Sequence, residues 1–398
     1  MTTVWSDVVD QPDAVTAFRS AAEDARGIVA GRAPLGHMTH AWLITGPPGS
    51  GRSTAARAFA AALQCDAQPP GCGHCTGCRT ALAGSHADVT LVATERVIIS
   101  IAEVAGLVTE AQQAPSQGRW RVIVVEDADR MVEQTSNLLL KAIEEPPPRT
   151  VWLLCTPSAA DVLPTIRSRC RHVNLRVPAV SEVADLIVRR DGVDRDTAMA
   201  AAAMAQSHIG LARHLATSEE ARARRRRLIT RPATVRSVSD AVIVADDLVT
   251  TAKDDAREAN ERRSAEEKTE LLRMLGYTEA TRMPAHVRSQ VRALEQNQER
   301  RATRLQRDAL DRTLIDLLSL YRDVYVTQTG AGVDLVNVDL VDLVHSLAEE
   351  STPQLTVFRL DAIAAARRRL AHNVTPLLVM EAMTIALRPQ QGAERRGR

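Results

Sequence analysis

Strand-like and helix-like patterns alternate through the first part of the chain. Three short apolar segments have the length and composition of buried strands, namely residues 40–46, 121–129 and 150–157. An alanine-rich helical segment covers residues 53–64, and an amphipathic segment at 132–148 ends in prolines. Alternation of this kind is typical of a parallel sheet with crossover helices. We therefore predict an α/β lobe over residues 1–178, with ligands at the carboxyl ends of its strands.

Strand patterns largely disappear after residue 178, and apolar residues recur at helical spacing instead. We predict an all-α domain over residues 179–232, a second over residues 233–390, and a disordered tail at 391–398. The long segment 254–312 mixes both signs of charge evenly, which is typical of solvated helices.

A glycine-rich turn joins the first predicted strand to the first predicted helix. The stretch GPPGSGRST runs from Gly46 to Thr54 and matches the phosphate-loop pattern G-x-x-x-x-G-K-[ST] except at one position. Its glycines are Gly46, Gly49 and Gly51. They let backbone N–H groups surround a phosphate, and the following helix adds its positive N-terminal end. Ser53 stands where a hydroxyl would bind Mg²⁺.

The exception is Arg52, which stands in place of the lysine that reaches the terminal phosphates of ATP. Arginine is bulkier and planar, so this exchange is not conservative. Binding through the backbone amides can survive it, and we expect weak nucleotide binding with little or no hydrolysis. The alternative is an ordinary glycine-rich turn between a strand and a helix.

Two acids follow the second predicted strand in an inverted order. Phosphate-loop enzymes place an aspartate for Mg²⁺ here, often followed by a glutamate that orients the attacking water. In this chain Glu126 comes first and Asp127 second. Each side chain differs from the required one by about one methylene, and catalysis is sensitive to displacements of about 1 Å. The pair is a second departure from a working ATP site, unless it is a solvated acidic turn.

Four of the six cysteines fall within one short segment, and they are Cys65, Cys72, Cys75 and Cys78. Thiolates at this spacing can close a tetrahedral Zn²⁺ site, and four sulfurs leave no position open for water. We therefore predict a structural zinc module at about residues 65–78. A redox C-x-x-C pair is the alternative function, and His74 is an alternative ligand.

Two arginine features remain. The segment PTIRSRC places Arg169 just beyond a late strand, where an arginine can stabilise charge on a phosphate. A surface arginine without such a role is the alternative. The segment RARRRRL, residues 222–228, could contact nucleic-acid phosphates or form a solvated helix face paired with acids such as Glu219 and Glu220.

Composition narrows the classes of function. The net charge is +1 at pH 7, so any contact with nucleic acid has to come from local patches. No apolar run reaches about 18 residues, so neither a membrane span nor a membrane partner is expected. The opening segment lacks the apolar region of a signal peptide. A chain of 398 residues with these features predicts a cytoplasmic protein of about two to four domains.

The motifs occur in a familiar order. A glycine loop, a four-cysteine insertion, NLLLKAIEEPPP and SRC together resemble the AAA+ clamp-loader subunits of bacterial DNA polymerase III, the gamma/tau and delta-prime proteins. Other segments agree, namely VWSDVVDQ at residues 4–11, HAWLITGPPGSGRS at 40–53, HADV at 86–89, SHIGLARHLA at 207–216 and NVTPLLVMEAM at 373–383. Asp10 replaces the glycine that is usual in the first of these. Nothing between residues 240 and 312 resembles the family.

The resemblance implies an architecture and a set of contacts. It implies an AAA+ nucleotide-binding lobe with a zinc module, a helical lid over residues 179–232 and a helical collar for oligomerisation over residues 233–390. The implied nucleotide-binding residues are Gly46, Gly49, Gly51, Arg52, Ser53, Thr54, Glu126, Asp127, Thr156 as sensor 1 and Arg213 as sensor 2.

Within this family the chain resembles the delta-prime branch, whose own ATP site is degenerate. It departs from the gamma/tau ATPases at Arg52 and at the acid pair, yet keeps Ser168, Arg169 and Cys170. The resemblance implies that Arg169 acts as an arginine finger on ATP held by a neighbouring gamma/tau subunit. The implied complex also contains a delta subunit and loads the beta sliding clamp onto primed DNA, serving the polymerase III core in the nucleoid. An active gamma-type ATPase and a purely scaffolding subunit are the alternatives.

Overall fold

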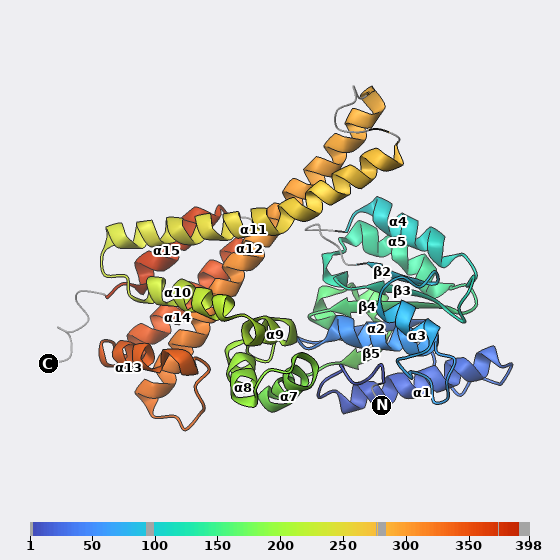
Figure 1. The fold of residues 1–398 in the computed structure, drawn as a ribbon, viewed down its shortest axis with the longest axis horizontal. Helices are drawn as coiled ribbons and strands as arrows, with labels where there is room; N and C mark the ends of the chain where they lie inside the picture. Colours follow the sequence, from blue (N-terminus) through green and yellow to red (C-terminus); the bar gives the residue numbers. More distant parts are fainter. Residues whose placement is uncertain (1–2, 93–98, 276, 278–283, 373, 390–398) are drawn as a thin grey trace. The chain divides into compact units, whose positions relative to one another are not determined.

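The computed structural model describes residues 3–92, 99–275, 277, 284–372 and 374–389. It divides the chain into two compact units, Met1–Thr217 and Ser218–Arg398 (Figure 1). No helix of the described ranges is both long and apolar enough to cross a membrane. The predicted disordered tail at residues 391–398 lies outside the described residues.

Five parallel strands form one sheet in the first unit, in the order β2-β3-β4-β1-β5. The strands are β1 (Ala41–Thr45), β2 (Val89–Val92), β3 (Arg121–Val125), β4 (Thr150–Thr156) and β5 (Arg171–Asn174). Every residue of β1, β3 and β4 is buried, and Leu43 lies opposite Leu154 where β1 pairs with β4. Strands buried on both faces read as continuous apolar runs. The predicted parallel α/β sheet is therefore confirmed.

Helices cover both faces of this sheet (Figure 1). Helices α1 (Pro12–Val29), α2 (Arg52–Leu63) and α3 (Thr76–Leu82) contribute to the core on one face, and α4 (Ile101–Ala111), α5 (Glu133–Glu144) and α6 (Pro164–Arg167) to the core on the other. The helices that follow β5, namely α7 (Val180–Asp191), α8 (Arg195–Met204) and α9 (Ile209–Thr217), pack against one another. Trp42 and Val122 point to the face that packs against α1 and α2, where Phe18 and Phe59 stack at 4.7 Å. Leu43 and the neighbouring odd positions point to the opposite face, against α4 and α5.

In the second unit, helices pack around a separate apolar core. They are α10 (Glu219–Ala233), α11 (Val238–Met274), α12 (Ala285–Thr329), α13 (Val341–Glu349), α14 (Pro353–Ala371) and α15 (Pro376–Leu387). The long helices α11 and α12 pack along each other. In the charged segment their contacts turn polar, since Arg301 pairs with Glu267 at 2.7 Å and Asn260 donates to the Gln298 carbonyl at 3.0 Å. Charge pairing across the two helices explains why a segment without apolar periodicity is helical.

The arginine-rich segment lies in α10 and pairs with groups of its own unit. Arg225 is buried, and its guanidinium donates to Asn337 at 2.7 Å and to Asp316 at 3.2 Å. Its neighbour Arg224 forms an ion pair with Asp255. This geometry favours the interpretation as a paired helix face over contact with nucleic acid.

The division between the two units differs from the predicted domain boundaries at residues 178 and 232. The division between Thr217 and Ser218 keeps α7–α9 with the sheet and assigns α10 to the second unit. The predicted lid extended to residue 232, but Ile229 and Ala233 pack in the core of the second unit. The division into lobe, lid and collar stays a prediction.

The HADV motif has a structural role. The carboxylate of Asp88 is fully buried and accepts hydrogen bonds from the backbone N–H groups of Ser116, Gln117 and Gly118. It also lies 3.1 Å from the guanidinium of Arg121. Burial raises the pKa of Asp88, but the N–H donors outweigh burial and lower the pKa to about 2. The carboxylate thus ties the loop before β3 to the start of β2.

Asp88→Asn should destabilise the first unit by about 3 kcal/mol at pH 7, because it removes the buried carboxylate that pairs with Arg121 and leaves Glu110, 3.8 Å away, as the nearest acid. A lowered pKa adds stability above the unfolded pKa of about 3.9, and this is lost as pH falls toward about 2. The difference between wild type and variant should therefore shrink by about 2 kcal/mol across that window. All four tryptophans lie in the first unit, so urea unfolding followed by tryptophan fluorescence measures it. Asp66→Asn, at an exposed ion pair, is the control.

Candidate functional site

The glycine loop joins β1 to α2 at the carboxyl edge of the sheet. Gly46, Gly49 and Gly51 all have positive φ, and Gly51 caps α2 in the left-handed conformation. A Cβ at Gly49 would lie 2.5 Å from Cγ of His208, so the start of α9 packs directly on the loop. Ser53 and Thr54 are half-buried in the first turn of α2. The backbone therefore has the form of a phosphate cradle.

Arg52 is folded back onto this loop. Its Nη1 donates to the carbonyl oxygen of Gly46, at the entrance of the cradle. Its Nε and the hydroxyl of Ser50 are buried and find no hydrogen-bond partner among the described residues. Burial lowers the pKa of Arg52, and Asp129 and Asp127 counteract this. The guanidinium thus bonds the loop's own carbonyl at Gly46, whereas a lysine at this position would reach a phosphate.

Glu126 is engaged by an arginine that the sequence did not single out. Nε and Nη2 of Arg57 both donate to Oε1 of Glu126, at 2.9 and 2.8 Å. Glu126 is 14% exposed, so a positive guanidinium neutralises it away from bulk water. Asp127, the second acid, lies 3.7 Å from Arg130. Because Arg57 already pairs with Oε1 of the first carboxylate, this site fits Mg²⁺ less well than a free carboxylate would.

The two predicted sensor residues have local partners. Thr156 is buried at the end of β4 and donates to the Ser158 carbonyl at 3.1 Å. Nε of Arg213 donates to Asp191 at 2.7 Å, and this bond lowers the pKa of that carboxyl. The structure thus brings the start of α9 to the loop while Arg213 is paired with the end of α7.

Arg169 lies outside this arrangement, on the surface between α5 and α6. Its Nη2 pairs with Oε1 of Glu144 at 2.7 Å, and its Nη1 donates to the Thr165 carbonyl at 2.8 Å and to Ser168 Oγ at 3.3 Å. The Arg169 side chain is 41% exposed. Among the described residues its contacts are to its own surroundings and not to the glycine loop.

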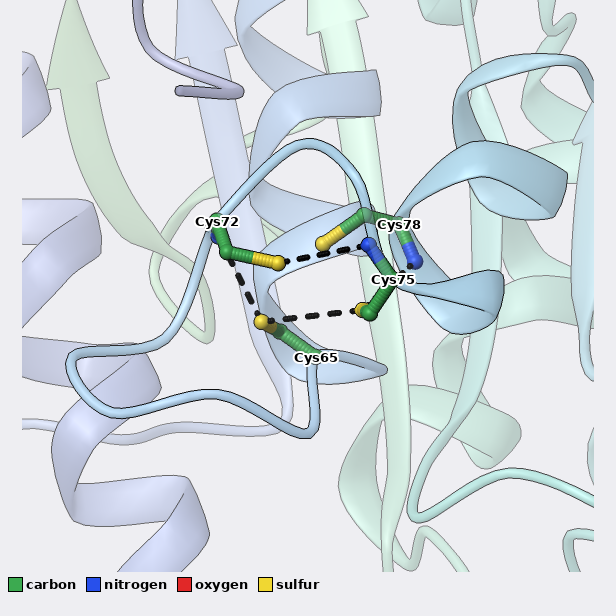
Figure 2. A group of neighbouring side chains, drawn as sticks. All are labelled: Cys65, Cys72, Cys75 and Cys78. Atoms are coloured by element: carbon green, nitrogen blue, oxygen red, sulfur yellow. Dashed lines mark hydrogen bonds between the residues drawn. The ribbon is translucent and has the colours of Figure 1, made fainter. Parts of the chain in front are cut away.

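The four clustered cysteines converge on one point (Figure 2). Their sulfur atoms all lie within 4.8 Å of one another, and those of Cys65 and Cys75 are 3.9 Å apart. Backbone N–H groups of Cys72, Cys75 and Cys78 each lie 3.4 Å from the sulfur of another member. All four thiols are free of disulfides, and burial raises the pKa of Cys78.

These distances fit a thiophilic metal. Sulfur atoms at the corners of a tetrahedron are about 3.8 Å apart when each is about 2.3 Å from a central zinc. Cys65 and Cys78 are buried and Cys72 and Cys75 half-buried, and four thiols so close together lose protons readily only when a cation compensates their charge. The arrangement can therefore hold a metal ion, and every sulfur of the set points inward (Figure 2).

One feature of the sequence could have indicated that Arg57 has a role in the site. Arg57 and Arg52 are the charged residues of the alanine-rich helix α2, and they stand five positions apart. An arginine in a helix that otherwise faces the core has to find an anion, and Glu126 follows the adjacent strand β3. The pair itself could not be predicted, because it joins residues 69 positions apart.

Arg57 and Glu126 give a test of the chain's own nucleotide site. Because Glu126 is paired, affinity for a fluorescent ADP should change less than about twofold between Mg²⁺ and EDTA. Arg57→Gln frees the carboxylate and should make the affinity depend on Mg²⁺. Fluorescence polarisation measures both, with Arg195→Gln at an exposed ion pair of α8 as control. Mg²⁺-tightened binding by the wild type would contradict this reading of the pair.

Comparison with known proteins shows what the first unit is similar to. Residues 28–179 match the family model described as DNA polymerase III, delta subunit. The delta' subunit of Pseudomonas aeruginosa is 34% identical over 154 residues, 38% of this chain and 47% of that protein. The delta' subunit of Escherichia coli is 32% identical over 186 residues, 46% of this chain and 55% of its own length.

The gamma/tau subunit of Mycobacterium tuberculosis is 32% identical over 201 residues, 49% of this chain and 33% of that protein. The chain thus spans between a third and just over half the length of these relatives. A solved gamma subunit-related protein of Thermotoga maritima aligns with 88% of this chain and 99% of its own at 16% identity, but its TM-score of 0.37 is too low to support a conclusion. The first unit of this chain is therefore similar in sequence to delta' and gamma/tau subunits of DNA polymerase III.

Proposed function

We propose that this protein is the delta-prime subunit of a bacterial clamp loader. It assists ATP hydrolysis in a neighbouring subunit and does not itself turn over ATP at a useful rate. Its complex contains gamma/tau and delta subunits and loads the beta sliding clamp onto primed DNA during chromosome replication, serving the polymerase III core. The site of this work is the cytoplasm, at the nucleoid.

One observation carries the proposal, namely the ion pair between Arg57 and Glu126. A gamma-type ATPase needs the first acid after β3 free to bind Mg²⁺ through its carboxylate. Here a guanidinium 2.8 Å away already pairs with one oxygen of that carboxylate and neutralises its charge. Arg52 adds to the effect because it bonds Gly46 of its own loop. Both delta' and gamma/tau proteins are similar in sequence to this chain, and the degenerate site favours delta'.

Arg169 is the residue proposed to act on the neighbour's ATP. It is exposed, always charged and outside the chain's own loop, as a finger acting on another subunit requires. Such a guanidinium stabilises the charge that develops on the transferred phosphoryl group. The nucleotide contacts of Gly46 to Thr54, Glu126, Asp127, Thr156 and Arg213 are proposed as the remnant of an ATP site. Its binding of ATP would be weak.

The remaining parts have proposed supporting roles. Cys65, Cys72, Cys75 and Cys78 hold a structural Zn²⁺, for which the convergence of four sulfurs is the support. Helices α7–α9 act as the lid, and the second unit acts as the collar through which the subunits assemble. Each of these assignments follows from the family resemblance.

The test of function is DNA-stimulated ATPase of the reconstituted complex with the clamp present. Arg169→Ala should lower turnover by about 100-fold or more, because a transition-state contact is lost. Arg52→Ala should change turnover less than about threefold. Size-exclusion chromatography checks that each complex is intact.

The two alternatives predict other results. A purely scaffolding subunit predicts that Arg169→Ala leaves turnover unchanged once assembly is intact. A gamma-type ATPase predicts that Arg52→Ala is the damaging change. Either result would overturn the proposed division of labour between this subunit and its neighbour.

The zinc assignment has its own test. The purified protein should contain about one zinc per chain by elemental analysis. Cys75→Ser should lose the metal and lower the melting temperature of the first unit by about 5 °C or more, because metal binding stabilises only the folded loop. Cys170→Ser, which changes the same chemistry outside the cluster, should keep the zinc. Full stability and activity without metal would contradict the assignment.

A further inference from the structure

We infer that Glu144 is a positioning residue for Arg169, holding its guanidinium ready for the neighbouring subunit's nucleotide. This inference rests on the proposed function of Arg169 as a finger. The carboxylate of Glu144 lies 2.7 Å from Nη2 of Arg169. It is an acceptor from α5, whereas the other two acceptors, the Thr165 carbonyl and Ser168 Oγ, belong to α6 and the residue just after it.

Three contacts from two helices fix the orientation of a side chain that would otherwise sample many rotamers. The Thr165 and Ser168 oxygens hold Nη1, and only Glu144 holds Nη2. A guanidinium has five N–H donors, so these contacts leave two for an incoming phosphate oxygen. Ordering a long arginine side chain costs conformational entropy. Because these contacts hold the Arg169 side chain before assembly, its conformational entropy is not lost again when the transition state forms.

The pair has little to contribute to folding. Both side chains are more than two-fifths exposed, and exposed ion pairs contribute little to the stability of a fold. Its effect is therefore expected in the action of Arg169 and not in the stability of the lobe. This separation makes the inference testable without loss of structure.

The position of Glu144 is set by the sequence that ends α5. Glu144 is the last residue of that helix, and prolines at 146–148 prevent its continuation. The next residue, Glu145, is also exposed, and its N–H bonds the Lys141 carbonyl as the helix cap. Among the described residues no ion pair of Glu145 is found. The chain thus offers a matched control of the same charge one position away.

The experiment compares Glu144→Gln with Glu145→Gln in the reconstituted complex with clamp and primed DNA. Glu144→Gln should lower kcat about tenfold and leave the KM for ATP unchanged, because ATP is held by the other subunit. Glu145→Gln should leave both constants unchanged. Glu144→Asp, which keeps the charge, should recover part of the lost kcat. In an Arg169→Ala background, Glu144→Gln should have no further effect.

Each other outcome overturns the inference. Equal losses of kcat for Glu144→Gln and Glu145→Gln would indicate a general charge effect. A further loss of kcat from Glu144→Gln in the Arg169→Ala background would indicate a structural role. A rise in kcat would show that Glu144 restrains Arg169 and does not ready it. If Arg169→Ala is itself without effect, the proposed function fails; if Arg169→Ala is severe and Glu144→Gln is silent, only the role of Glu144 fails.

Discussion

Close packing around the glycine loop is the constraint on which the first unit depends. A Cβ at Gly46 would lie 2.7 Å from the carbonyl oxygen of Leu175, which follows β5, and one at Gly49 would overlap His208. Strand β1, the segment after β5 and the start of α9 therefore approach each other only if these positions carry no side chain. The loop has to keep its glycines for the fold to form, whether or not a phosphate enters it.

This constraint separates the shape of the site from its chemistry. Arg52 can replace lysine because its guanidinium bonds the loop carbonyl at Gly46 and leaves the backbone unchanged. Arg57 can form an ion pair with Glu126 because a carboxylate paired with arginine can be buried as readily as one bound to a metal. The exchange at Arg52 alters the shape and reach of the cation, and the pair with Arg57 neutralises the acid, and catalysis depends on both. A chain can thus retain the form of an ATPase while its own site is altered, in keeping with the proposal that the reactive charge is presented by Arg169.

The parts of the fold predicted from sequence are those with strong local patterns. The segments at 40–46, 121–129 and 150–157 became β1, β3 and β4, since central strands are continuous apolar runs. The edge strands β2 and β5 were not predicted, because each is four residues long and partly exposed. The cysteine cluster was predicted because its ligands are close in sequence. The Arg57–Glu126 pair and the burial of Arg225 were not, because each depends on contacts between distant segments.

The cysteine loop also explains the opening segment of the chain. The N–H of Val4 donates to the Gly71 carbonyl at 3.1 Å, and a Cβ at Gly71 would lie 2.8 Å from the indole nitrogen of Trp5. A loop with so few apolar residues needs a cross-link to stay in contact with Val4 and Trp5, and a metal bound by the four converging sulfurs can provide it.

The same opening segment continues to Asp10, which has a φ of 54° at the position where a glycine is usual in the family. Aspartate tolerates this conformation better than most residues. Its carboxylate accepts from the N–H of Ala179 at 3.0 Å and pairs with Arg176, and the first of these bonds lowers its pKa. Residues 4–11 therefore connect the cysteine loop to the N-terminus of α7, so a metal bound at the sulfurs would stiffen the junction at which the helices α7–α9 leave the sheet.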